Sequence, residues 1–203
     1  MGKYDFIKIK KKLSKYLDEA RFEHTMGVMY TCAALAMVYG YDLEDAQAAG
    51  LLFSVCTSSL LFSVLLPNKK KLKLCSQHDI PVSDFEKDHP FLLHAKLGAY
   101  VASSKYDIKD EEILTAITYH TTGRPGMSLL EKIVFVADYI EPRRNKASNL
   151  SKLRQMAFID IDRTVYEIMD QTLRYLKSKK VPIDSLTKKS CDYYRALCGE
   201  KDV

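Results

Sequence analysis

The segment "EEILTAITYHTTGRPGMSLLEKIVFVADYIEP" (111–142) decides the fold, because two helical patterns meet in it around a glycine-containing turn. In its first half, apolar residues and His120 share one stripe at helical spacing. In its second half, Ser128 and Glu131 form the pattern of a capping box, and Pro142 marks where the helix should stop. The segment therefore predicts two amphipathic helices joined by a short turn.

Outside this segment, helical spacing recurs along most of the chain, and few stretches alternate with a period of two. Gly40 is a suitable stop for one helix, and Asp42 has the position of an N-cap for the next. The patterns cover residues 24–40, 89–106, 109–120, 128–142, 160–180 and 184–198. They predict an all-α helical bundle in a single domain over residues 1–203. We expect its core at about 12–176, followed by a C-terminal helical extension at 177–203.

Composition narrows the class of protein without naming a function. The chain has 203 residues, of which 47% are hydrophobic and 28% charged, a balance typical of a globular domain with a real core. The net charge of +5 is modest and its lysines are dispersed, so we expect no nucleic-acid partner. Five cysteines without a CxxC pair argue against a disulfide scaffold and for a reducing compartment, with the cytoplasm as default.

Four polar residues lie on the apolar faces of four predicted helices: His24, His94, His120 and Asp138. Burying such groups without partners costs free energy, so helices normally turn them outward. A single histidine on an apolar face is usually a satisfied core residue. Four such residues on separate helices instead predict a metal site in the core of a bundle, since a buried carboxylate needs a cation.

The turn after His120 offers groups that bind phosphate. Thr122 supplies a hydroxyl, Gly123 allows close approach of the backbone, and Arg124 supplies a guanidinium. Arg144 follows the second helix in a similar way. The alternative is an ordinary Gly-Pro turn with a surface arginine, and the pattern alone leaves both open.

Several segments together resemble the YqeK-like branch of the HD-domain phosphohydrolases over roughly residues 12–176. They are "RFEHTMGV" (21–28), "DAQAAGLL" (45–52), "HPFLLHAKLGAYVA" (89–102), the segment 111–142 and the C-terminal amphipathic helix. The resemblance implies a helical bundle with a two-metal centre, usually iron. It also implies symmetrical hydrolysis of diadenosine tetraphosphate to two ADP molecules, with Arg124 and Arg144 as phosphate contacts.

By position, the resemblance makes His24 and Asp138 ligands of one metal. His94 and His120 become ligands of the other. These assignments come from the matching motifs and not from spacing.

The resemblance breaks directly after "AGLL", where the family has a His-Asp dyad and this chain has Phe53 and Ser54. In the family, that aspartate bridges the two metals. Phe53 offers no metal donor, and Ser54 offers only a neutral, weak one. The resemblance therefore implies two incomplete half-sites, with weaker metal binding and hydrolysis reduced by orders of magnitude.

Three explanations compete for the anomalous segment 53–66. The uncharged stretch 46–68 has the length of a transmembrane helix, although it would remove one helix from the bundle. An evolved substitution would make the chain a nucleotide-binding pseudoenzyme. Compensating frameshifts, in the gene or in its recorded sequence, would replace the interior and leave both matching flanks intact. The nucleotide sequence would reveal them. We expect a dinucleoside polyphosphate or another nucleotide as partner, and a homodimer is the default assembly.

Overall fold

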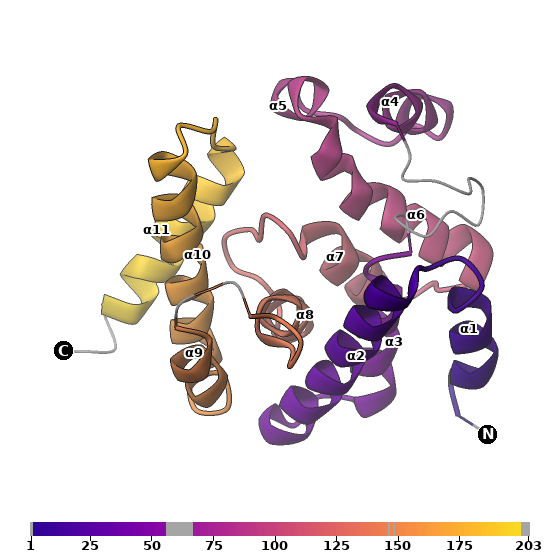
Figure 1. Ribbon diagram of the computed structural model, residues 1–203, viewed down its shortest axis with the longest axis horizontal. Coiled ribbons are helices and arrows are strands. Elements are labelled where there is room, and N and C mark those ends of the chain that lie inside the picture. Colours follow the sequence, from indigo (N-terminus) through magenta and orange to yellow (C-terminus); the bar gives the residue numbers. More distant parts are fainter. Residues whose placement is uncertain (1, 56–66, 146, 148, 200–203) are drawn as a thin grey trace.

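The computed structural model describes residues 2–55, 67–145, 147 and 149–199. Every regular element in these ranges is a helix, as the sequence predicts (Figure 1). They are α1 (Phe6–Leu13), α2 (Glu19–Tyr39), α3 (Leu43–Leu52), α4 (Asn68–Gln77), α5 (Asp84–Asp88), the 3₁₀-helix η1 (Pro90–Leu93), α6 (His94–Tyr106), α7 (Glu111–Tyr119), α8 (Leu129–Ile140), α9 (Leu150–Met156), α10 (Ile161–Ser178) and α11 (Ser185–Gly199).

The predicted helix ends are confirmed where a capping residue marks them. Gly40 ends α2 with a left-handed φ of 69°, a conformation that glycine adopts without strain. Asp42 begins α3, and its side chain accepts a hydrogen bond from the backbone N–H of Asp45. Ser128 and Glu131 form both hydrogen bonds of the capping box at the start of α8.

One predicted helix is wrong in detail. The helical pattern over residues 89–106 is two elements, η1 followed by α6. His89 has a non-helical backbone (φ −125°, ψ 61°), and Pro90 has no N–H to donate, so the chain enters through a 3₁₀ turn.

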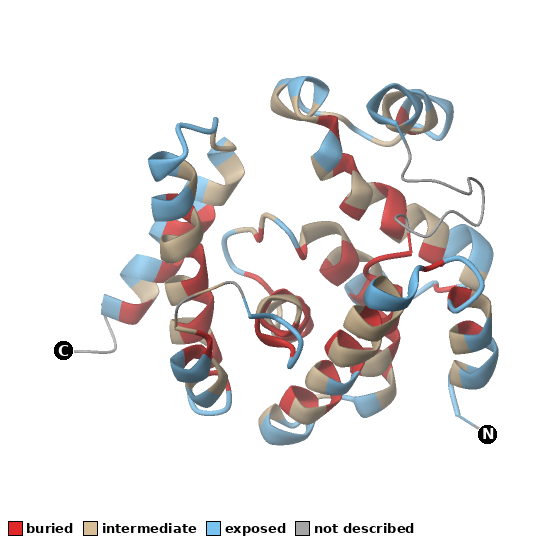
Figure 2. Ribbon diagram, viewed as in Figure 1, coloured by how far each residue is buried: buried red, intermediate tan, exposed pale blue. Residues whose placement is uncertain are grey.

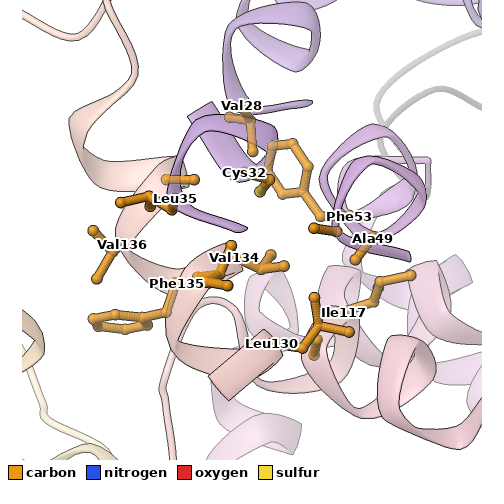
Figure 3. Packing of buried hydrophobic residues seen from close by; sticks show 14 of the residues in the cluster. Val28, Cys32, Leu35, Ala49, Phe53, Ile117, Leu130, Val134, Phe135 and Val136 are labelled. Atoms are coloured by element: carbon orange, nitrogen blue, oxygen red, sulfur yellow. The ribbon is translucent and has the colours of Figure 1, made fainter. Parts of the chain in front are cut away.

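Helix α8 lies at the centre of the molecule and packs against α2, α3, α7 and α10 (Figure 1). Most of its side chains are buried, as the red ribbon in Figure 2 shows. Phe53 belongs to this core and lies beside Cys32 and Ala49 in Figure 3. Helices α2 and α3 approach closely, since a Cβ on Gly50 would lie 2.7 Å from the Cys32 sulfur.

The described part of the expected C-terminal extension packs into the same core. Helix α11 lies against α10, and its Cys191 and Tyr194 are members of the main hydrophobic cluster. The Tyr194 hydroxyl accepts a hydrogen bond of 3.0 Å from the backbone N–H of Met127. This contact ties the end of the chain to the turn that precedes α8.

Residues 56–66 of the anomalous segment lie outside the described residues, so most of the 46–68 stretch does too. Within the described ranges, no helix is long and apolar enough to cross a bilayer. Phe53, Ser54 and Val55 are described; they follow α3 directly and are buried.

Candidate active site

The four predicted metal donors line one cavity of about 610 Å³. His24 comes from α2, His94 is the first residue of α6, His120 follows α7, and Asp138 lies in the last turns of α8. Phe53 also lines this cavity. The sequence therefore identifies side chains that the fold brings together from four separate helices.

His24 and Asp138 form the first pair, with 3.0 Å between Nε2 and Oδ1. The other ring nitrogen of His24, Nδ1, lies 3.0 Å from Oε1 of Glu141. Burial alone would lower the pKa of His24, but hydrogen bonds to the two carboxylates outweigh it and raise that pKa. Burial alone would raise the pKa of Asp138, whereas His24 and Arg144 hold it well below its usual range.

Glu141 is a further residue of this site, and the sequence analysis did not identify it. Its side chain is 1% exposed, and its Oε2 accepts a hydrogen bond of 2.8 Å from the Arg143 backbone N–H. A Cβ on Gly27 of α2 would collide with this carboxylate, so glycine makes the room that Glu141 occupies. The available signal was its spacing, since Glu141 follows Asp138 by one helical turn.

His94 and His120 form the second pair, with their Nε2 atoms 3.2 Å apart. Each Nδ1 lies against a backbone carbonyl oxygen, of Phe91 at 2.8 Å and of Ile117 at 2.7 Å. A carbonyl only accepts, so we assign the proton of each neutral ring to Nδ1. Burial lowers the pKa of both rings, that of His94 to about 4. Two unprotonated Nε2 atoms therefore face each other. The Thr121 hydroxyl oxygen lies 3.1 Å from the Nε2 atom of His94.

Phe53 lies against both pairs. Its ring centroid is 5.7 Å from that of His24 and 5.1 Å from that of His120, edge-on in both cases. The side-chain hydroxyls of Ser54 and Thr25 are 2.8 Å apart. The space next to both pairs is thus filled by a hydrocarbon ring that offers no donor to a metal.

The predicted phosphate-binding groups divide between the cavity and the turn. Arg144 lines the cavity, and its Nη2 donates a 2.8 Å hydrogen bond to Asp138. Thr122 donates to the carbonyl of Gly123, and Arg124 donates through Nε and Nη2 to Glu131 at 2.6 and 2.8 Å. For Thr122, Gly123 and Arg124, a role in phosphate binding stays a prediction.

A second, larger cavity of about 1020 Å³ adjoins the first. The two share Ala20, His24 and Arg144 in their walls. The larger one extends from these residues along the loop between α8 and α9 to α10. No motif in the sequence pointed to it, because its walls come from segments far apart in the chain.

Comparison with known proteins places this geometry in a family. The HD domain family model matches residues 70–143. A symmetrical bis(5'-nucleosyl)-tetraphosphatase of Halalkalibacterium halodurans is 39% identical over 168 residues, which are 83% of this chain and 85% of the relative. The chain belongs to this family of HD-domain phosphohydrolases. The Bacillus subtilis protein of the same name is 33% identical over 171 residues, 84% of this chain and 87% of that one.

A solved structure of an HD-family protein supports the same assignment. It is a predicted HD superfamily hydrolase involved in NAD metabolism from Clostridium acetobutylicum, 34% identical, with a TM-score of 0.88 over 97% of this chain and 100% of that one. The match to the HD model includes His94, His120 and Asp138 and begins after Phe53 and Ser54. The solved structure, which covers 97% of this chain, extends the family framework to the residues before the departure.

HD-domain phosphohydrolases depend on divalent metals, and the donor chemistry here fits such an ion in part. The two bare nitrogens of His94 and His120 are separated about as two ligands of one metal are, roughly 3.0–3.4 Å for bonds near 2.1 Å. Nδ1–H bonds to backbone carbonyls, and a carboxylate behind His24, are typical supports for metal-binding histidines. The donors form pairs, however, and the described residues contain no group of three that could hold an ion. The arrangement fits an ion at either pair but lacks the bridge of a two-metal centre.

Proposed function

We propose that this protein is a divalent-metal-dependent hydrolase of dinucleoside tetraphosphates, cleaving them symmetrically into two nucleoside diphosphates, with iron as the metal. The observation that supports this most is the pair of bare Nε2 atoms of His94 and His120, which share one cavity with the His24–Asp138 pair. Two lone pairs facing each other in a buried site are unfavourable unless a cation lies between or beside them.

The side chains divide the work of binding and orienting the substrate. A bound divalent metal would polarise a phosphoryl group and lower the pKa of water. Arg144, whose side chain is 47% exposed at the cavity, would bind phosphate oxygens by charge-assisted hydrogen bonds. Glu141 holds the ring of His24 so that Nε2 faces Asp138, and the Thr121 hydroxyl can donate to the unprotonated Nε2 of His94.

A second candidate function is nucleotide binding with impaired catalysis, and the position of Phe53 favours it. The ring lies against both histidine pairs where a bridging carboxylate would be needed. Without a bridge, the separation of two metals is not set, so we expect hydrolysis to be slower by orders of magnitude than in the family.

A single assay tests both candidates. The full chain is loaded with Fe²⁺ or Mn²⁺ and incubated with diadenosine tetraphosphate, and the nucleotides are separated by chromatography. We expect slow release of ADP alone, lost in the His120→Ala variant. ATP with AMP would contradict symmetrical cleavage. A rate equal to that of the Bacillus subtilis relative would contradict the effect assigned to Phe53. Calorimetry with ADP shows whether binding survives where turnover is absent.

We also propose a cytoplasmic location and a two-fold homodimer. The cysteines in the described ranges are buried free thiols, as a reducing compartment favours. The homodimer rests only on its frequency among soluble oligomers. Light scattering after gel filtration would decide it, since a mass of one chain would contradict the dimer.

A further inference from the structure

We propose that Arg154, in the last turn of α9, is a positioning residue for the candidate active site. It holds the start of the loop between α8 and α9, and this loop places Glu141 behind His24 and Arg144 at the cavity. Arg154 lines neither of the two cavities, so it acts only through the residues that it holds. The ligands that the loop serves, a divalent metal and phosphate, rest on the proposed function.

The guanidinium of Arg154 donates hydrogen bonds to four backbone carbonyl oxygens at the end of α8 and just beyond it. Its Nε lies 2.8 Å from the carbonyl oxygen of Ile140. Its Nη2 is shared among the carbonyl oxygens of three residues, at 2.9 Å for Glu141, 3.3 Å for Pro142 and 2.8 Å for Arg144. The chain that leaves α8 is therefore gathered around one side chain.

The end of α8 needs both hydrogen-bond donors and positive charge. A helix leaves its last four carbonyl groups without partners in its own turns, and these carbonyls form the negative end of the helix dipole. The carboxylates of Asp138 and Glu141 lie at this same end. A guanidinium suits the position, because its planar fork presents several N–H donors in fixed directions and keeps its charge.

The helix that carries Arg154 is anchored independently of the loop. Leu150 and Leu153 of α9 are buried, and α9 packs against α10 as well as against α8. Directly after α9, the carbonyl of Ala157 accepts a hydrogen bond of 2.8 Å from the hydroxyl of Tyr39 in α2. The guanidinium therefore reaches the loop from a fixed support.

The residues that Arg154 holds are those that contact the His24–Asp138 pair. Oε1 of Glu141 lies 3.0 Å from Nδ1 of His24. Arg144 donates to Asp138 twice, from Nε to the carbonyl oxygen at 2.9 Å and from Nη2 to Oδ1 at 2.8 Å. Arg144 also donates its backbone N–H to the carbonyl of Glu141 at 3.0 Å. A shift of this backbone would displace the partners of both members of the pair, whereas the second histidine pair comes from α6 and α7.

Hydrogen exchange and calorimetry on the full chain test this role. We expect Arg154→Ala to speed exchange of the backbone N–H groups of residues 143–145. We expect it also to weaken the binding of Mn²⁺ and of inorganic pyrophosphate by about 3- to 30-fold. Arg154→Lys keeps the charge and much of the side chain. It should change all three measurements in the same direction, because an ammonium group cannot reach four carbonyls at once.

Two controls on the same helix separate positioning from a general loss of stability. Lys152→Ala removes an exposed positive charge from α9 and should leave exchange and both affinities unchanged. Leu153→Ala removes a buried side chain, so it should lower the stability of the fold without weakening either ligand. In a His24→Ala background, Arg154→Ala should have no further effect on Mn²⁺ affinity, because the remaining histidine pair is not held by the loop.

The outcomes separate this inference from the proposed function, because no measurement depends on hydrolysis. Weaker binding in Arg154→Ala and Arg154→Lys, but in neither control, supports the positioning role even if no tetraphosphate is cleaved. Unchanged Mn²⁺ and pyrophosphate affinities in Arg154→Ala would overturn it, even with faster exchange, because the contact would then serve stability alone. An equal loss of affinity in Leu153→Ala, or a full further loss of Mn²⁺ affinity in the His24→Ala background, would also overturn it.

Discussion

At the scale of single residues, Glu141 determines how His24 is presented. Its buried carboxylate lies between His24 and Gly27, and a Cβ at Gly27 would displace it. The convergence of His24, His94, His120 and Asp138 on one cavity could be predicted because each is a polar residue on an apolar stripe, and their role as metal donors stays a prediction. For Glu141 the sequence offered only its spacing from Asp138, because its contact with the His24 ring nitrogen appears only in the three-dimensional structure.

We predict that Glu141→Gln weakens Mn²⁺ binding about 10- to 100-fold, as loss of a carboxylate behind a metal-binding histidine does. Gly27→Ala should have a similar effect, because the methyl group displaces the Glu141 side chain. Calorimetric titration of Mn²⁺ measures both. Glu23→Gln is the control, since Glu23 pairs with Arg143 at an exposed position. Equal Mn²⁺ affinity in all variants would contradict the role of Glu141 in positioning His24.

The two histidine pairs should differ in their response to pH. The pKa of His24 is raised, so near pH 6 it carries a proton that a metal must displace. The pKa of His94 is lowered to about 4 and that of His120 is also lowered, so both are already neutral there. Metal affinity at the His24–Asp138 pair should therefore rise with pH until His24 deprotonates, and affinity at the other pair should not.

Calorimetry in buffers of different ionisation enthalpy counts the protons released. At about pH 6 we expect proton release on Mn²⁺ binding, a decline in this release as the pH rises through the raised pKa of His24, and no release in His24→Ala. His94→Ala should leave the release unchanged. If His94→Ala abolished the proton release and His24→Ala did not, the protonation states assigned to the two pairs would be reversed.

At the scale of elements, local chemistry explains which helices the sequence predicted. The starts of α3 and α8 are fixed by capping residues close in the chain, so they could be read directly. Helix α1 was missed although its sequence is amphipathic, with Ile9 and Leu13 buried. The short helices α4, α5 and α9 were missed because each buries few residues and carries little periodic apolar pattern. Tertiary contacts, which no short window contains, determine them.

The start of α8 also gives Arg124 a structural role. Its guanidinium pairs with Glu131, which is 1% exposed and belongs to the capping box. Arg124→Ala should lower the free energy of unfolding by about 2 kcal/mol, because a buried carboxylate loses its cation. The estimate is below the range for fully buried pairs because the Arg124 side chain is 38% exposed.

Urea denaturation measures the effect of Arg124→Ala. Lys87→Ala is the control, since Lys87 pairs with Asp84 at an exposed position and its loss should leave stability nearly unchanged. If Arg124→Ala leaves stability unchanged but weakens pyrophosphate binding, the arginine is a phosphate contact as the sequence first indicated. The stabilising role would then be wrong.

At the scale of the whole molecule, fold and activity rest on different numbers of residues. The bundle is held by apolar positions spread over α2, α3, α7, α8 and α10, so it tolerates a local replacement, as the TM-score of 0.88 to a family structure shows. The metal bridge that the resemblance implies depends on only two adjacent positions, which Phe53 and Ser54 occupy here. For this reason the sequence could predict the family and the fold while giving reason to doubt the activity.

If the helical bundle of the family is intact, two substitutions should restore the missing His-Asp dyad. In the double variant Phe53→His and Ser54→Asp, the new side chains face the cavity from the end of α3, beside His24 and His120. Without metal we expect a loss of stability of about 2 kcal/mol or more, since polar groups replace a ring that is 3% exposed. With Fe²⁺ or Mn²⁺ we expect more bound metal per chain, a rise in melting temperature by mass action, and ADP release at least about 100-fold faster.

Metal content by mass spectrometry, thermal unfolding and the diadenosine tetraphosphate assay measure the three effects together. Phe53→Leu is the control, because it shortens the ring without adding a donor and should gain neither metal nor activity. A double variant that binds two metals but stays inactive would show that residues 56–66 also carry part of the catalytic site. One that binds no additional metal would show that the two pairs are not the halves of one centre.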